Sequence, residues 1–160
     1  MAELRVGTAY DAHRLVPGRP LVLGGVTVPH PLGLEGHSDA DIVCHALCDA
    51  LLGAAALGDI GQHFPPGDPR WKDASSLDLL SRARRLAAGE GWRVVNVDAF
   101  VVLQEPRLAP YREAMCDLVA RALDTEPVRV SVRATTTDGL GFVGRGEGAA
   151  CHAVALLERG

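Results

Sequence analysis

The sequence has little positive charge: 16 basic residues, of which Lys72 is the only lysine, stand against 20 acidic ones, a net charge of -4 at pH 7. No overall positive field attracts nucleic acid or anionic lipid, and we expect neither nucleic acid nor a membrane as a partner. No run of 18 apolar residues occurs, because even the richest segment, Ala46 to Leu57, contains Asp49. We therefore expect no membrane-spanning helix. The chain does not open with a basic segment and an apolar run, so we expect no signal peptide and a cytoplasmic protein.

Cysteines are few and form no C-x-x-C pair, which argues against a zinc ribbon or a thioredoxin-like site. Of the four, Cys44 and Cys48 lie in an apolar run, where we predict small buried side chains. Internal repeats, low-complexity tracts and linkers are also missing. The chain is 48% hydrophobic and 22% charged over 160 residues, which excludes intrinsic disorder. It predicts a single domain over residues 1–160.

The hydrophobic patterns predict an α+β fold, a small mixed β-sheet with helices packed on one face. A Ser38-Asp-Ala-Asp41 capping box opens the first long helix, and a Gly24-Gly25 pair marks a tight hairpin. The predicted strands are 4–13, 21–23, 26–28, 94–103, 128–134 and 149–157, and the predicted helices are 38–57, 75–88 and 110–123. Residues 59–69, rich in Gly and Pro, are predicted to form a loop.

Two polar groups of residues suggest a site. Asp11 and His13 are two apart at the end of the first strand, so their side chains share one face. Alone, such a pair is more typical of a turn or an exposed surface. His37, Asp41, His45 and Asp49 recur every four residues and would stack along the first helix.

The helical stripe has a plain alternative, which is a solvated helix face with Asp41 as the acid of the capping box. Two histidines and three acids, Asp39 included, without one basic residue favour a functional face. Asp11, His13 and His45 together would supply one carboxylate and two imidazoles, the pattern of catalytic zinc with an open fourth position. His37 would then face the same cleft. The sequence leaves open whether the strand and the helix meet.

A third group follows the strand 128–134. Thr135, Thr136, Thr137 and Asp138 precede a glycine-rich segment, and hydroxyls with glycine backbone suit phosphate oxygens, to which Arg145 could add charge. Threonines also end strands, and glycines also make turns, so this signal is weak alone. Residues 59–61 and 64–68 also have two interpretations, either a loop that leaves the helix or a wall of a substrate site.

Together these segments resemble the 2-C-methyl-D-erythritol 2,4-cyclodiphosphate synthase (IspF) family. The matching motifs occur in the family's order over nearly the whole chain: Tyr10-Asp-Ala-His-Arg-Leu15, His37-Ser-Asp-Ala-Asp41, His45-Ala-Leu-Cys-Asp-Ala-Leu-Leu-Gly53, Leu57-Gly-Asp-Ile-Gly61, Phe64-Pro65 and Thr135-Thr-Thr-Asp-Gly-Leu-Gly-Phe142. The resemblance implies a homotrimer with active sites between subunits. It implies conversion of 4-diphosphocytidyl-2-C-methyl-D-erythritol 2-phosphate to the 2,4-cyclodiphosphate with release of CMP, in non-mevalonate isoprenoid synthesis.

The resemblance also implies roles for single residues. Asp11, His13 and His45 would hold one Zn²⁺ per subunit, His37 and Thr136 would stabilise the transition state, and Mg²⁺ or Mn²⁺ would bind the diphosphate. The implied substrate contacts are Asp11, His13, His37 and Ser38; Asp59, Ile60, Gly61, Phe64, Pro65 and Asp68 on the methylerythritol and phosphate side; Leu103, Arg107, Ala109, Thr135, Thr136, Thr137 and Asp138 on the cytidine diphosphate side; and Phe142 and Arg145 at a trimer-axis cavity that can take isoprenoid diphosphates.

Two positions depart from the family pattern: Asp138 replaces a common Glu and would reach the second metal through water, and Tyr10 replaces a common Phe. Two other functions fit the same residues. A zinc phosphohydrolase would give an opened phosphate in place of a cyclic product. A non-catalytic trimer that binds isoprenoid diphosphates would keep its function when His37 is replaced.

Overall fold

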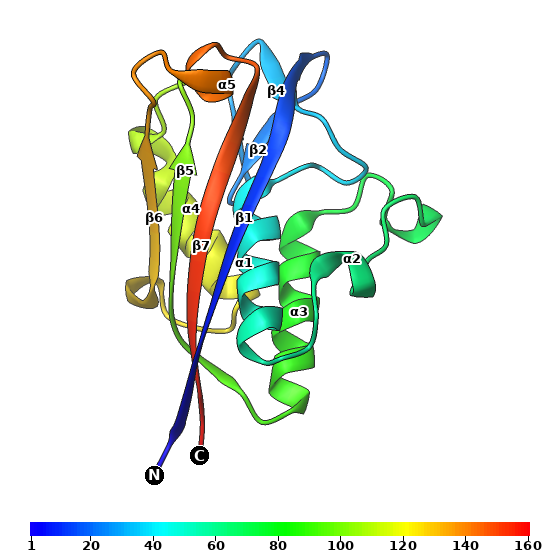
Figure 1. Cartoon of the computed structure of the whole chain (residues 1–160), viewed down its shortest axis with the longest axis vertical. Helices are drawn as coiled ribbons and strands as arrows, with labels where there is room; N and C mark the ends of the chain where they lie inside the picture. Colours follow the sequence, from blue (N-terminus) through cyan, green and yellow to red (C-terminus); the bar gives the residue numbers. More distant parts are fainter.

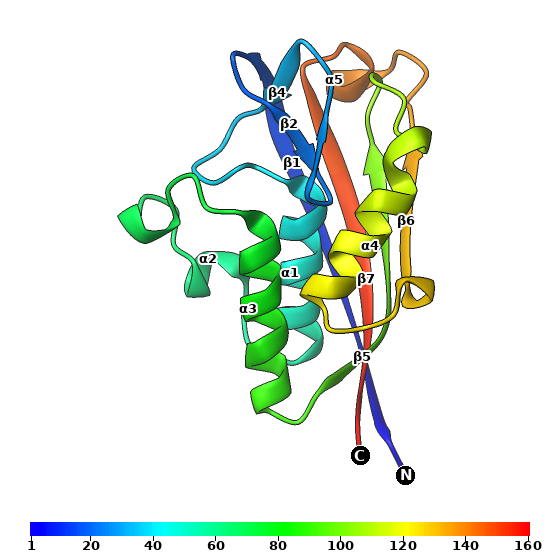
Figure 2. The same cartoon turned by 180° about the vertical axis from the view of Figure 1, so that it is seen from behind.

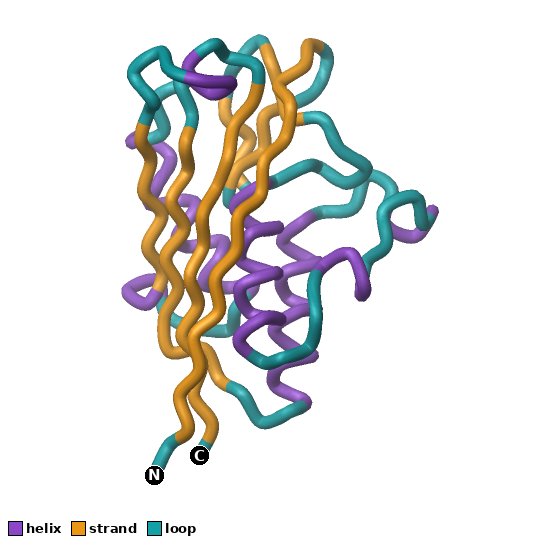
Figure 3. Tube along the Cα trace, viewed as in Figure 1, coloured by secondary structure: helices purple, strands orange, loops and turns teal.

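The computed structural model describes all 160 residues, and seven strands form its two sheets. The strands are β1 (Glu3–Pro17), β2 (Leu21–Leu23), β3 (Val26–Val28), β4 (Leu32–Leu34), β5 (Arg93–Val102), β6 (Val130–Thr135) and β7 (Gly148–Arg159). The larger sheet has the order β4-β1-β7-β5-β6, and β2 pairs with β3 in a separate hairpin (Figure 1). Only β5 and β6 run parallel, so the sheet is mixed, as predicted. Figure 3 traces β1 beside β7, with both chain termini at one end of this strand pair.

The helices are α1 (Ile42–Ala54), α2 (Ile60–His63), α3 (Ser76–Gly89), α4 (Arg112–Ala122) and α5 (Gly141–Gly144), with 3-10 turns at Pro69–Trp71, Ala109–Tyr111 and Pro127–Arg129. Figure 2 shows α1, α3 and α4 on the same face of the sheet. This arrangement confirms the predicted α+β class with helices on one face. No helix is both long and apolar enough to span a bilayer.

Helix α1 is the centre of the core because it packs against β1 and β7 on one side and α3 on the other. Ten of its 13 residues are buried, so it is apolar around most of its circumference. Cys44 and Cys48 are among these buried residues, as predicted. The two polar residues of the helix, His45 and Asp49, are the ones that stay half-buried. They therefore mark the side of the helix that is open to a site.

The predicted start of this helix at Ser38 is wrong. Ala40 has a φ of 57°, which a right-handed helix cannot include, and α1 begins at Ile42 with Asp41 as its N-cap. The Asp41 carboxylate is fully buried and accepts hydrogen bonds from Val43 N and Cys44 N, both at 3.1 Å. It also accepts from the amides of Gly24 and Gly25 in the β2–β3 turn, at 2.9 and 2.7 Å. Asp41 therefore caps the helix and does not stack with the histidines.

Other boundaries shift for local reasons. The hairpin at 21–28 is confirmed, whereas β4 was not predicted, and the predicted loop 59–69 contains α2. The short helix α5 was not predicted either. The remaining strands and helices match their predicted segments within one to four residues at each end, with 3-10 turns at 109–111 and 127–129 taking the place of the first residues of the predicted helix and strand.

Candidate metal centre and flanking pockets

Strand β1 aims two site residues at the helix layer. Along it, Ala9, Asp11 and His13 are half-buried while Tyr10 and Ala12 are exposed, the alternation expected of a strand with one covered face. Asp11 and His13 therefore project together toward α1, as their spacing of two predicts.

Helix α1 supplies the third group. Asp11 Oδ2 lies 3.1 Å from His13 Nε2 and 3.3 Å from His45 Nδ1, and one ligand atom from each of the three residues lies within 4.8 Å of the others. The strand and the helix thus meet at this point. A carboxylate and two imidazoles at this separation could hold a divalent metal ion.

The second nitrogen of each imidazole is already engaged. His13 Nδ1 lies 2.7 Å from the carbonyl oxygen of Glu35, which can only accept, so this nitrogen carries the proton. His45 Nε2 lies 2.9 Å from Ser76 Oγ and 3.1 Å from Ser38 Oγ. His13 Nε2 and His45 Nδ1 are therefore the nitrogens that face Asp11, and each would be the one to ligate a metal ion bound there, as in metal sites whose histidines are held through their other nitrogen.

The charges at this centre fit a cation. Burial opposes ionisation of Asp11, but hydrogen bonds from His13 and His45 outweigh burial and hold the pKa of Asp11 well below its usual range. The hydrogen bond to Asp11 in turn raises the pKa of His13, against the effect of burial. Asp11 is therefore an anion at neutral pH, ready to bind a proton-bearing imidazole or a metal ion.

The three residues open into a cavity of about 250 Å³. His37, Ser38, Ile60, Gly61 and Phe64, all expected from the sequence, line it together with Asp11, His13 and His45. His37 and His45 thus face one cavity, although His37 precedes the helix. Trp71 and Leu79 also line this cavity, and neither was expected from the sequence. Trp71 had a usable signal, since a large aromatic side chain stands there between Arg70 and Lys72.

The wall around Trp71 is held by ring contacts. Phe64 and Trp71 meet edge to face with ring centroids 5.1 Å apart, and the guanidinium groups of Arg70 and Arg82 each lie 5.4 Å from the Trp71 ring. These contacts fix the part of the cavity wall that Phe64 and Trp71 form.

Three expected acids do other work. Asp49 Oδ1 accepts from Ile60 N at 2.7 Å, and no histidine is hydrogen-bonded to Asp49. Asp59 caps α2 through Gln62 N, and Asp68 pairs with Arg70. The Asp68 backbone carbonyl nevertheless accepts from His37 Nε2 at 2.9 Å. Pro65 is exposed in the same loop and does not line the cavity.

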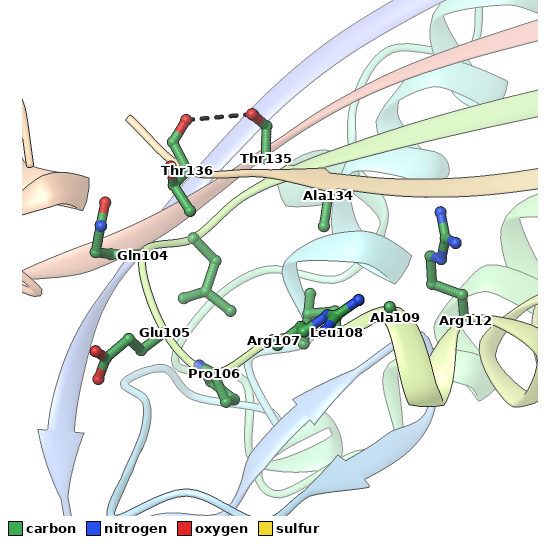
Figure 4. Close-up of a pocket in the computed structure, with 11 residues that line it drawn as sticks. Gln104, Glu105, Pro106, Arg107, Leu108, Ala109, Arg112, Ala134, Thr135 and Thr136 are labelled. Atoms are coloured by element: carbon green, nitrogen blue, oxygen red, sulfur yellow. Dashed lines mark hydrogen bonds between the residues drawn. The ribbon is translucent and has the colours of Figure 1, made fainter. Parts of the chain in front are cut away.

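A second pocket of about 400 Å³ lies where the segment 103–109, after β5, faces the end of β6 (Figure 4). The whole segment 103–109, with the expected Leu103, Arg107 and Ala109, lines it together with the expected Thr135 and Thr136, and Arg112 and Ala134 line it without having been predicted. The two pockets share no lining residue. One chain therefore does not bring the cytidine-side and metal-side residues into one cavity.

The remaining expected residues lie beyond both pockets. Thr137 donates to the carbonyl of Leu140 at 2.6 Å, and Asp138 Oδ1 accepts from Thr136 Oγ1 at 3.3 Å, so both hold the turn after β6. Phe142 lines a separate hollow next to His13, and Arg145 pairs with Glu147 at 2.9 Å.

Comparisons with known proteins agree on one family. The model of the YgbB family matches residues 4–158. The 2-C-methyl-D-erythritol 2,4-cyclodiphosphate synthase of Moorella thermoacetica is 60% identical over 154 residues, which are 96% of this chain and 94% of that one. A structure of a 2C-methyl-D-erythritol-2,4-cyclodiphosphate synthase in a form bound to CDP is 39% identical, with a TM-score of 0.87 over 96% of this chain and 99% of that one. The structure of the bifunctional IspDF of Campylobacter jejuni is 40% identical, with a TM-score of 0.96. That match covers 100% of this chain and 43% of the IspDF chain.

Proposed function

The chain belongs to the YgbB family of 2-C-methyl-D-erythritol 2,4-cyclodiphosphate synthases, and from this membership we infer its reaction. It converts 4-diphosphocytidyl-2-C-methyl-D-erythritol 2-phosphate to 2-C-methyl-D-erythritol 2,4-cyclodiphosphate and releases CMP, as a cyclising phosphorus-oxygen lyase of isoprenoid precursor synthesis. The observation that carries this function at the level of the site is the meeting of Asp11, His13 and His45 across β1 and α1.

Asp11, His13 and His45 hold one Zn²⁺ in our proposal. The donor set fits, because both histidines turn the nitrogen that is not engaged elsewhere toward an ionised carboxylate and no fourth protein ligand closes the group. When bound, the ion acts as a Lewis acid and template that neutralises charge on the diphosphate. A second divalent cation, Mg²⁺ or Mn²⁺, accompanies the diphosphate, with Asp138 the acid beside the cytidine-side pocket.

The reaction asks for alignment more than for a strong base. The 2-phosphate of the substrate attacks the β-phosphorus, a phosphorus-oxygen bond forms, and the bond to the bridging oxygen breaks so that CMP leaves with that oxygen. A phosphate monoester has a second pKa of about 6 and is mostly dianionic at neutral pH. The protein therefore supplies orientation and charge neutralisation, and holding both ends of one molecule in line gains a large proximity advantage.

His37 and Thr136 donate to oxygens that gain charge. His37 Nε2–H donates to the Asp68 carbonyl, which leaves Nδ1 as the nitrogen available to substrate. Through Nδ1 the imidazole would then donate to a phosphate oxygen that gains charge. Thr136 lines the second pocket and offers its hydroxyl there.

We propose that three copies of the chain complete these sites. The metal-side and cytidine-side pockets are separate in one chain, so a neighbouring subunit would bring one against the other. The face of β1 and β7 away from the helices supports this assembly, because it exposes apolar side chains that an isolated chain would leave in water, namely Leu4, Val6, Tyr10 and Val154.

Mixed trimers test the shared site. His37→Ala removes a metal-side group and Thr136→Ala a cytidine-side group, so each variant alone is expected to be inactive. Coexpression of the two with different tags should restore one site in each mixed trimer, about a third of its sites, because one of the three interfaces then pairs an intact metal side with an intact cytidine side. The measurement is CMP release by trimers purified through both tags. No recovery in the mixed trimers would show that each chain completes its own site.

Phosphorus NMR tests the reaction itself. Purified protein with 4-diphosphocytidyl-2-C-methyl-D-erythritol 2-phosphate and magnesium should give the two coupled signals of a cyclic diphosphate in step with CMP. The signals should not arise in a chelator-stripped sample, because charge neutralisation at the diphosphate is then lost. An opened phosphate product would instead indicate a hydrolase.

A further inference from the structure

The nitrogen of His45 that points away from the metal group, Nε2, contacts Ser76, which is hydrogen-bonded to Asp39. Neither Ser76 nor Asp39 has a role in the reaction described above. We propose that Asp39 and Ser76 position His45, with the Ser76 hydroxyl transmitting the effect of Asp39, and that this pair sets the affinity of the metal centre. The inference rests on the proposed metal at Asp11, His13 and His45.

The direction of each hydrogen bond follows from the groups involved. The Asp39 carboxylate accepts from the Ser76 hydroxyl through Oδ1 and from Ser76 N through Oδ2 at 3.0 Å, and Oδ1 also accepts from Asp41 N at 3.2 Å. A carboxylate with these donors is an acceptor only, so the hydroxyl proton of Ser76 points to Asp39. The lone pairs of Ser76 Oγ then face His45 Nε2 at 2.9 Å and require a proton on it.

This chain of bonds fixes the tautomer of His45. With a proton held on Nε2, Nδ1 is the nitrogen that faces Asp11, 3.3 Å away, and the one free to ligate a metal ion. The carboxylate acts here through a hydroxyl. The effect is the same as in carboxylate–histidine–metal arrangements, where an outer carboxylate orients the histidine ligand. Ser38 Oγ offers a longer contact of 3.1 Å to the same nitrogen and also accepts from Ala40 N, so it is the weaker partner.

Burial of Ser76 holds its hydroxyl in place. Ser76 is fully buried as the first residue of α3, where a hydroxyl without a partner would be costly. The N-cap residue Ser75 makes no side-chain capping bond, and Asp39 accepts the Ser76 amide instead. Asp39 thus links α3 to the segment before α1 by hydrogen bonds, and it acts on His45 through the Ser76 hydroxyl. Of the three acids near the histidines in the sequence, Asp41 and Asp49 are committed to backbone amides, and Asp39 alone reaches a histidine in this way.

Zinc affinity is the test. Competition against a chromophoric chelator should show that Ser76→Ala weakens zinc binding by about 10- to 100-fold, the range typical of outer partners of metal ligands. Asp39→Asn should weaken it in the same direction. The double variant should bind no more weakly than Ser76→Ala, because Asp39 acts through the hydroxyl. Ser75→Ala is the matched control, exposed and one residue away, and should bind zinc as the unmodified protein does.

A second readout separates positioning from general damage. Long-range proton–nitrogen NMR of the metal-free protein should show His45 protonated at Nε2, and Ser76→Ala should lose this preference while urea unfolding shows the fold retained. If Ser76→Ala fails to fold, Asp39→Asn carries both measurements. Equal zinc affinity and an unchanged His45 tautomer in these variants would overturn the positioning role while leaving the metal centre intact. Failure of the unmodified protein to bind zinc would overturn the metal centre, and the proposal with it.

Discussion

Replacing His45 with alanine is expected to strip the protein of zinc and to lower kcat by about 10³-fold or more. The chain offers only three ligands, and His45 is the one that α1 brings to the pair on β1. With it gone, Asp11 and His13 remain as a two-ligand site whose carboxylate has also lost a hydrogen-bond donor. The measurements are zinc content after gel filtration and the rate of CMP release.

His37→Ala is the matched control for His45→Ala. His37 lines the same cavity but stands outside the ligand set, so this variant should keep its zinc. Its turnover should nevertheless fall by about 10²- to 10³-fold, because a donor to the developing charge is lost. Retained zinc in His45→Ala would refute the assigned ligand set. Full turnover in His37→Ala would favour a trimer in which zinc serves structure alone.

The periodicity of the sequence predicted half of the metal site well. A spacing of two on a strand put Asp11 and His13 on one face, and His45 stands on the side of α1 that faces them. The stripe at every fourth residue failed at its start, because Ala40 has a positive φ and Asp41 turns its carboxylate to the amides of Gly24 and Gly25. Both Ser38 and Asp41 are good capping residues, and a tertiary contact decides between them.

The outer partner of His45 could not be predicted in the same way. Ser76 is 31 residues from His45, and a serine at the start of a helix usually indicates capping alone. Its contact with His45 exists because α3 packs against α1, which no local pattern records. The separation of the two pockets is likewise a result of the fold. The segment 103–109 and the threonines after β6 share one pocket because β5 and β6 are parallel neighbours whose carboxyl ends meet.

Gly7→Val is expected to lower the free energy of unfolding by about 3 kcal/mol or more. Gly7 is buried in β1 where the strand crosses α1, and a Cβ placed there would lie 1.9 Å from Ala50 O and 2.6 Å from Ala54 N. These are backbone atoms of a buried helix, so no side chain can rotate away to make room. The strand and helix must separate, and urea unfolding followed by circular dichroism would measure the loss.

Gly53→Ala is the control for this effect. Gly53 lies in α1 itself with open space around its Cβ position, so alanine should raise stability by up to about 1 kcal/mol through helix propensity. Unchanged stability in Gly7→Val would mean that β1 and α1 can move apart freely. If they cannot, the variant that still folds should also bind zinc more weakly than Gly53→Ala, because β1 carries Asp11 and His13 and α1 carries His45. The missing side chain at Gly7 would then set the distance across which the metal is held.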